Sequence, residues 1–237
     1  MNTVLMMMGG SGSRMGAGVP KQYIEIEGKP VFWYIVKGYA RIPEIDNICI
    51  VSHADWIPYV EDAVKDIEFH GRLIVTAGGD NRSQSIRNGL HAIEDFSDDQ
   101  DVIMMHDATH PYVDKEGTLQ VIEAVKQYGG ATLGARQYDT CYQMDEQMML
   151  SKVIPRQEIV SGASPEAFRF GDMRDIYFNA DDEELASMTS AGAIALAHHI
   201  EMKVIPTRTL NLKLTYPEDL ELLKLLLDKY YLLGHRL

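Results

Sequence analysis

The sequence predicts an α/β protein whose parallel sheet is covered by helices on both faces. Short apolar runs of strand length alternate along the chain with longer runs whose apolar residues recur three and four positions apart. Because strands and helices alternate, consecutive strands are expected to lie parallel. The 237 residues, 46% of them apolar, are enough to bury the core of one large domain. We therefore expect a single domain over residues 1–237.

Six runs predict the strands of this sheet. Each is rich in apolar or β-branched residues and has about the length of a buried parallel strand. In chain order the predicted strands are 2–8, 47–52, 72–77, 101–107, 130–136 and 201–206.

Amphipathic runs between these strands predict the helices. Pro30 opens the first of them at a favourable first-turn position. In chain order the predicted helices are 30–42, 54–67, 82–96, 115–129, 184–199 and 217–233.

One stretch, 138–163, departs from the alternation. It is polar and has no helical period, and it is too long for an ordinary connection. We expect a functional excursion such as an arm or a lid.

Composition excludes several classes of protein. The 22 basic and 35 acidic residues give a net charge of −13, which disfavours contact with nucleic acid or an anionic membrane. No apolar run is long enough to span a bilayer, and the first residues do not form a secretion signal. A cytoplasmic protein is expected. Cys49 and Cys141, the two cysteines, have no metal-ligand spacing and suggest no disulfide framework.

The loop after the first strand, 9–23, has the glycine rhythm of a dinucleotide-binding motif. Gly18 and Pro20 stand where the helix of that motif must run, and they disfavour the helix. A Walker motif is excluded because no Gly-Lys-Ser/Thr follows. The loop, with Arg14 and Lys21, is better suited to cradle a polyphosphate. The alternative is a glycine-rich surface loop with two solvated cations.

Three further stretches favour a nucleotide site. Asp107 follows an apolar strand, at the sheet edge where open α/β folds bind ligands, and a carboxylate there suits Mg²⁺. Gly79 follows another strand, with Ser85 in the first turns of the next helix. Lys213 lies between Leu212 and Leu214, so in a strand it points opposite to them. Two of these residues have a plain alternative: Asp107 as a turn or helix-capping aspartate, and Lys213 as a solvated edge residue.

These stretches together resemble a known family. "GGSGSRMG", "PKQY", "GGDNRSQSIRNGL", "HDATHPYV", "RQEIVSGASPEAF" and "NLKLTYPEDL" follow in the order found in cytidylyltransferases acting on 2-C-methyl-D-erythritol 4-phosphate or D-ribitol 5-phosphate. The resemblance implies a Rossmann-like nucleotidyltransferase fold with a mainly parallel sheet. It implies that CTP and a polyol phosphate give a CDP-polyol and pyrophosphate with Mg²⁺. It also implies a homodimer interlocked through an extended arm, at 138–163.

The resemblance also implies roles for single residues. Arg14, Lys21 and Lys213 match the cations on the triphosphate and the α-phosphate, and Asp107 matches the magnesium ligand. The positions at which the family recognises cytosine and its ribose match Gly10, Gly12, Gly79, Asp80 and Ser85. The polyol phosphate falls on Ser164 and, from the neighbouring subunit's arm, on Thr140 and Arg156.

Two positions depart from the family pattern. His110 stands where the family usually has arginine, and Glu183 where it has threonine. Loss of a permanent cation and gain of a carboxylate both oppose phosphate binding. Glu183 either points away from the substrate, or the site takes a differently shaped polyol phosphate.

Three interpretations remain open. "GGSGSRM" and the Ser-Gly before "ASPEAF" are slightly closer to the ribitol phosphate enzymes, whereas "GAGVPKQY" is closer to the methylerythritol phosphate enzymes. Ribitol 5-phosphate is favoured on this balance. A non-catalytic nucleotide-binding dimer is the alternative from another class, and the retained charges Arg14, Lys21, Asp107, Arg156 and Lys213 speak against it.

Overall fold

A seven-stranded sheet forms the centre of the computed structural model, which describes residues 1–8, 19–187, 190–207 and 210–227. Its strand order is β11-β7-β10-β6-β1-β4-β5. The strands are β1 (Asn2–Met7), β4 (Asn47–Ser52), β5 (Arg72–Ala77), β6 (Val102–Asp107), β7 (Gly129–Arg136), β10 (Val160–Arg169) and β11 (Glu201–Pro206). Only the pairings of β10 with β6 and β7 are antiparallel, so the predicted mainly parallel sheet is confirmed.

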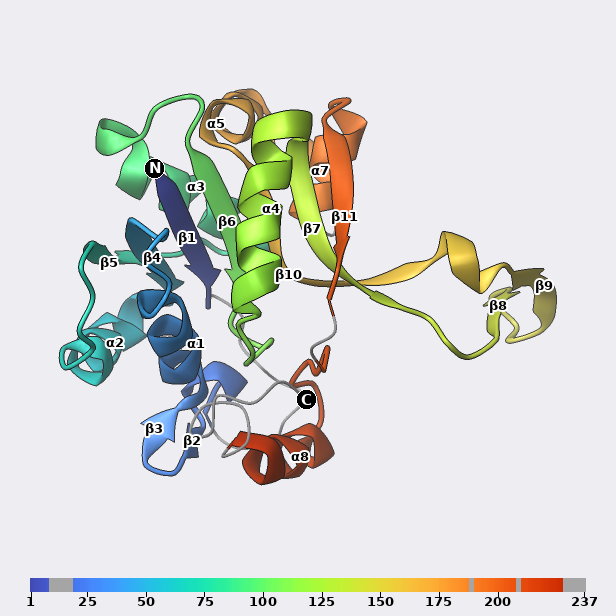
Figure 1. Ribbon diagram of the computed structural model, residues 1–237, viewed down its shortest axis with the longest axis horizontal. Coiled ribbons are helices and arrows are strands. Elements are labelled where there is room, and N and C mark those ends of the chain that lie inside the picture. Colours follow the sequence, from blue (N-terminus) through green and yellow to red (C-terminus); the bar gives the residue numbers. More distant parts are fainter. Residues whose placement is uncertain (9–18, 188–189, 208–209, 228–237) are drawn as a thin grey trace.

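Helices cover both faces of this sheet (Figure 1). On one face α1, α2 and α4 pack into a core that includes Phe32, Val60 and Val121. On the other face α3, α5 and α7 pack around Leu90 and Tyr177. The helices are α1 (Val31–Ala40), α2 (Ile57–Val64), α3 (Arg82–Ile93), α4 (Lys115–Tyr128), α5 (Phe170–Asn179), α6 (Asp182–Ser187), α7 (Ala191–Ala197) and α8 (Pro217–Leu227).

The predicted strands and first four helices are found close to the expected bounds. The strands 47–52, 72–77 and 201–206 match residue for residue. Pro30 differs from its prediction: it is the extended residue that precedes α1, in the short strand β3 (Lys29–Pro30) paired with β2 (Glu25–Ile26). None of the described helices is long and apolar enough to cross a membrane.

The predicted helix 184–199 is wrong as one element. It is two helices, α6 and α7, and Ser190 begins the second because its side chain accepts the N–H of Ala193. A serine at this position satisfies a free helix donor, which outweighs the continuous apolar pattern.

Residues 138–163 form an arm that projects away from the sheet (Figure 1). β7 and β10 continue outward as a paired ribbon, from Leu133↔Ala163 to Arg136↔Val160. Beyond them lies the antiparallel hairpin β8 (Cys141–Met144) and β9 (Leu150–Ile154). Its apolar side chains are open to solvent, with Met148 71% and Leu150 66% exposed.

Candidate functional site

A cavity of about 710 Å³ opens at the carboxyl ends of β1, β5 and β6. The chain passes from β1 to β4 on one side of the sheet and returns to β6 on the other, which makes this edge the topological switch point of the fold. The cavity is lined by Met7, Met8, Lys21, Gln22, His53, Gly79, Asp80, Asn81, Arg82, Ser85, Asp107, Ala108 and Thr109.

The turn from β5 into α3 forms one wall of this cavity. Ser85 Oγ accepts the N–H of Gly79 at 3.0 Å and donates to the Asn81 carbonyl at 2.8 Å. A Cβ on Gly79 would lie 2.5 Å from the Cβ of Gln84, so the turn requires glycine there. The predicted neighbours Gly79, Asp80 and Ser85 therefore meet in one tight turn whose first helix residues face the cavity.

Asp107 closes β6 and faces two cations. Arg82 Nη2 lies 2.9 Å from its Oδ1, and Lys213 Nζ lies 3.6 Å from its Oδ2. Burial acts to raise the pKa of the Asp107 carboxyl, but Arg82, Lys213 and His110 together hold that pKa below its ordinary value. Asp107 is therefore an anion at neutral pH.

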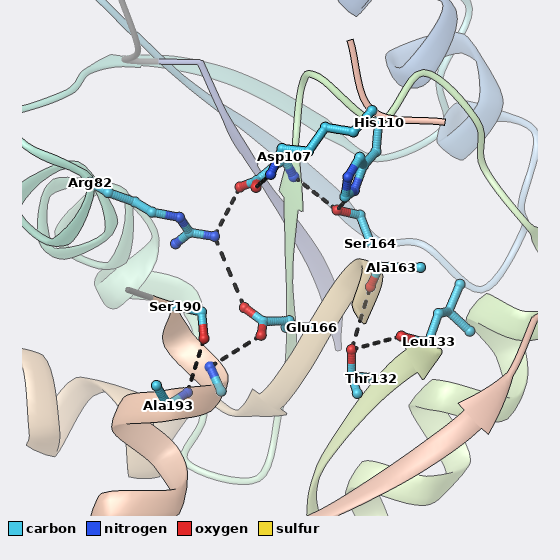
Figure 2. A network of polar contacts seen from close by, with 12 residues as sticks. Arg82, Asp107, His110, Thr132, Leu133, Ala163, Ser164, Glu166, Ser190 and Ala193 are labelled. Carbon is cyan, nitrogen blue, oxygen red and sulfur yellow. Dashed lines mark hydrogen bonds and ion pairs between the residues drawn. The ribbon is translucent and has the colours of Figure 1, made fainter. Parts of the chain in front are cut away.

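Sequence reasoning missed two members of this cluster. Arg82 reaches from the first residue of α3, and its Nη2 also lies 4.0 Å from Glu166 Oε2, so one guanidinium stands between two carboxylates (Figure 2). Burial raises the pKa of Glu166, and nearby Arg82 opposes that rise. Arg82 stands inside the motif "GGDNRSQS", but nothing local shows that it points toward a residue 25 positions away.

His110 and Ser164 lie beside Asp107. Ser164 Oγ accepts the N–H of Asp107 at 3.3 Å and lies 2.8 Å from His110 Nδ1. Burial lowers the pKa of His110 to about 4, helped by His106 and Lys213 and opposed by Asp107. The position that usually carries arginine is thus a neutral hydrogen-bonding group at pH 7.

Lys21 and Lys213 approach from two distant segments that are joined to each other. Lys21 Nζ donates to the Leu214 carbonyl at 2.6 Å, and the Leu214 N–H donates to the Thr109 carbonyl at 2.8 Å. The strand considered for Lys213 is not formed. Leu214 is nonetheless buried, and Lys213 points the other way, toward Asp107.

Other predicted residues lie elsewhere. Thr140 and Arg156 belong to the arm, where Arg156 Nη1 donates to the Tyr138 carbonyl at 2.5 Å. Glu183 is exposed on α6, and no described contact joins it to Asp107. Gly10, Gly12 and Arg14 lie outside the described residues.

The donor set of the site suits a shared magnesium ion rather than a protein-only metal cage. Among the described residues, no three His, Cys, Asp or Glu side chains group as metal ligands. Asp107 offers one partly exposed carboxylate beside the cavity. Mg²⁺ is commonly held by one or two carboxylates together with substrate phosphates, and this arrangement fits that mode.

Comparison with known proteins identifies relatives across nearly the whole chain. The family model described as IspD, 2-C-methyl-D-erythritol 4-phosphate cytidylyltransferase, matches residues 2–229. A 2-C-methyl-D-erythritol 4-phosphate cytidylyltransferase of Acidobacterium capsulatum is 30% identical over 92% of this chain and 94% of its own. A ribitol-5-phosphate cytidylyltransferase of Streptococcus agalactiae serotype Ia is 27% identical over 96% of both chains.

Solved structures share the fold. The 4-diphosphocytidyl-2C-methyl-D-erythritol synthase of Anaerococcus prevotii superposes with a TM-score of 0.79 at 23% identity, over 96% of both chains. The 2-C-methyl-D-erythritol 4-phosphate cytidylyltransferase of Thermus thermophilus gives a TM-score of 0.70 at 18% identity, covering 94% of this chain and 97% of that one.

Proposed function

The chain belongs to the 2-C-methyl-D-erythritol 4-phosphate cytidylyltransferase family, and from this premise we propose that it transfers the cytidylyl group of CTP to ribitol 5-phosphate. It is a nucleotidyltransferase whose family acts on CTP and a phosphorylated polyol. The observation that carries the proposal is the convergence of Arg82 and Lys213 on Asp107, beside a cavity lined by the Gly79–Ser85 turn.

The nucleoside is assigned to the wall formed by Gly79, Asp80 and Ser85. The turn is tight because glycine at position 79 lets the Gln84 side chain pack against its backbone, and the turn lines the cavity. Gly10 and Gly12 are assigned to the same nucleoside from the sequence motif alone.

The chemistry requires alignment and charge neutralisation. A phosphate oxygen of the polyol phosphate attacks the α-phosphorus of CTP, the bond from that phosphorus to its bridging oxygen breaks, and pyrophosphate leaves with the electron pair. The attacking oxygen is already an anion, so no strong general base is needed. Two anionic reactants repel each other, and Lys21, Lys213 and Arg14 are assigned to offset that repulsion.

Asp107 is the residue that would hold Mg²⁺ with the triphosphate. The ion, when bound, neutralises phosphate charge and orients the leaving pyrophosphate. The two cations facing Asp107 keep its carboxylate ionised, which is the form that a metal ion requires.

The polyol is assigned to the side of the site that carries His110 and Ser164. Both are uncharged hydrogen-bonding groups at neutral pH, which suits an unbranched chain with a hydroxyl on each carbon. The exposed position of Glu183 on α6 keeps its carboxylate from the described cluster. 2-C-Methyl-D-erythritol 4-phosphate is the second candidate, favoured by the name of the 30% identical relative.

The polyol phosphate is assigned in addition to Arg156 and Thr140 of a partner's arm. The arm projects away from its own sheet (Figure 1), and exposes Tyr142 and Val153 at its hairpin, which a second copy of this chain would cover. We therefore propose a homodimer with shared sites.

Pyrophosphate release tests the activity. The protein should release pyrophosphate from CTP with Mg²⁺ and ribitol 5-phosphate, with a higher kcat/KM than with 2-C-methyl-D-erythritol 4-phosphate. EDTA should abolish the reaction. The reverse order of kcat/KM would transfer the assignment to the second candidate, and absence of release with a panel of sugar and polyol phosphates would favour the non-catalytic dimer.

Mixed dimers test the shared site. Lys21→Ala and Arg156→Ala should each be nearly inactive, because each removes a cation that aligns the phosphates. When the two variants are unfolded, mixed equally and refolded, about half of the dimers are mixed, and one of the two sites in each is whole. About a quarter of refolded wild-type activity should return. If both residues serve the same subunit, mixing restores nothing, provided that subunit exchange is verified.

A further inference from the structure

Arg82 lies between two carboxylates that come from different strands. Its Nη2 is 2.9 Å from Asp107 Oδ1, on β6, and 4.0 Å from Glu166 Oε2, on β10 (Figure 2). Its other terminal nitrogen, Nη1, is buried and has no hydrogen-bond partner among the described residues. A buried donor without an acceptor costs free energy. The position that Arg82 occupies therefore leaves part of its hydrogen-bonding capacity unused.

Glu166 is fixed in place, so it does not approach Arg82 by itself. Its Oε1 accepts the N–H of Gly192 at 3.3 Å, at the start of α7. A Cβ on Gly192 would lie 2.7 Å from the same oxygen, which shows how closely the carboxylate sits on that backbone. Asp107 is likewise held by the pairing of β6 with β1. Of Arg82, Asp107 and Glu166, Arg82 has the longest side chain and is the one able to move between the other two.

We infer that Arg82 is a positioning residue with two positions: it pairs with Asp107 in the absence of metal and with Glu166 when a divalent cation occupies Asp107. The inference rests on the proposed function, which makes Asp107 the metal ligand. A metal ion and a guanidinium on one carboxylate repel each other. Glu166 offers Arg82 a second partner. Arg82 Nη2 would have to move about 1 Å toward Glu166 Oε2, because a charge-assisted hydrogen bond needs about 2.9 Å. Glu166 thereby raises the metal affinity of Asp107 without touching the metal.

Mn²⁺ binding without nucleotide tests this inference by a readout other than activity. Free Mn²⁺ is followed by electron paramagnetic resonance in titrations of wild type, Arg82→Gln, Glu166→Gln and the double variant. Arg82→Gln should bind Mn²⁺ about fivefold more tightly and Glu166→Gln about fivefold more weakly. The double variant should bind like Arg82→Gln, because Glu166 acts only through Arg82. Arg72→Gln is the charge-matched control. It removes a cation of β5 that lies over the ring of Phe96, and it should bind Mn²⁺ like wild type.

Additive effects, with the double variant near wild type, would show two independent charges and overturn the inference, as would equal affinities in all four proteins. If circular dichroism shows that Arg82→Gln does not fold, the Mn²⁺ affinity of Glu166→Gln is compared with that of wild type. An unchanged affinity overturns the inference. Pyrophosphate release by the wild type reports separately on the proposed function. If the wild type is active but the effects on Mn²⁺ affinity are additive, the proposed function stands and the inference about Arg82 is wrong.

Discussion

Replacing the buried His106 by glutamine is expected to weaken the dependence of stability on acid pH. His106 lies on β6 with no exposed surface, and its Nε2 and Nδ1 lie 2.7 Å from the His110 carbonyl and the Tyr39 hydroxyl. A carbonyl only accepts, so Nε2 carries a proton, and in the neutral imidazole Nδ1 accepts from the Tyr39 hydroxyl. Burial favours the neutral form of this imidazole.

The magnitude follows from the pKa of His106. Burial lowers it to about 4, against the opposing effects of the His110 carbonyl and the Asp107 charge. The unfolded chain takes up a proton near pH 6.5, whereas the folded protein does not until about pH 4, so stability rises with pH between these values and is lost as the pH falls. The interval from pH 6.5 to pH 4.5 within this window corresponds to about 2 kcal/mol of unfolding free energy.

Urea unfolding at pH 6.5 and pH 4.5 measures this difference. Wild type should lose about 2 kcal/mol more than His106→Gln between the two pH values. His106→Gln keeps a donor for the His110 carbonyl, and His91→Gln, at an exposed histidine stacked on Phe178, controls for loss of a surface imidazole. If wild type and His106→Gln lose equal unfolding free energy between the two pH values, burial does not hold His106 neutral.

Three further changes have defined outcomes. Asp107→Asn should lower turnover by about a hundredfold or more across a magnesium titration, since it removes the charge of the proposed metal ligand while keeping its shape. If the variant turns over like wild type, Asp107 is only a turn residue. Asp114→Ala should cost about 1 kcal/mol in urea unfolding, because the Asp114 side chain caps α4 at the Gly117 N–H, and an unchanged midpoint would contradict this cap. Leu150→Asp with Val153→Asp should give a monomer in light scattering, since both exposed side chains lie on the hairpin proposed to join two subunits, and a persistent dimer would place the interface elsewhere.

Elements with a strong local signal were predictable from the sequence. The buried parallel strands are apolar over most of their length, and a helix such as 115–128 has both an acidic cap at Asp114 and a glycine, Gly129, with φ 97° at its end. The missed strand β10 contains Pro165 and Glu166 and lacks a continuous apolar run, so its place in the sheet depends on its neighbours β6 and β7. α5 has no prediction either, because the motif that ends at Phe168 contributes only to the family resemblance.

The candidate site was predictable where a motif placed a residue at a strand end. Asp107 and the Gly79–Ser85 turn follow from local pattern, and the tertiary structure adds that Lys213 reaches Asp107. Arg82 and Glu166 depended on the direction of side chains from α3 and β10, which no spacing in the chain encodes. The role proposed for Arg156 involves a second copy of the chain, and the sequence predicts the arm but not what the arm contacts.

The central position of β10 has a consequence for the order of folding. The strands β5, β4, β1 and β6 are complete once residue 107 has been synthesised, but the edge of β6 stays unpaired until residues 166–169 follow. β7 and β11 join the other strands only through β10. The nascent chain therefore carries a half-sheet with an open, apolar edge over some sixty residues of synthesis, roughly 3–12 s at ordinary rates of translation. Insertion of the antiparallel strand, rather than formation of the parallel core, is the step that protects this chain from pairing with another.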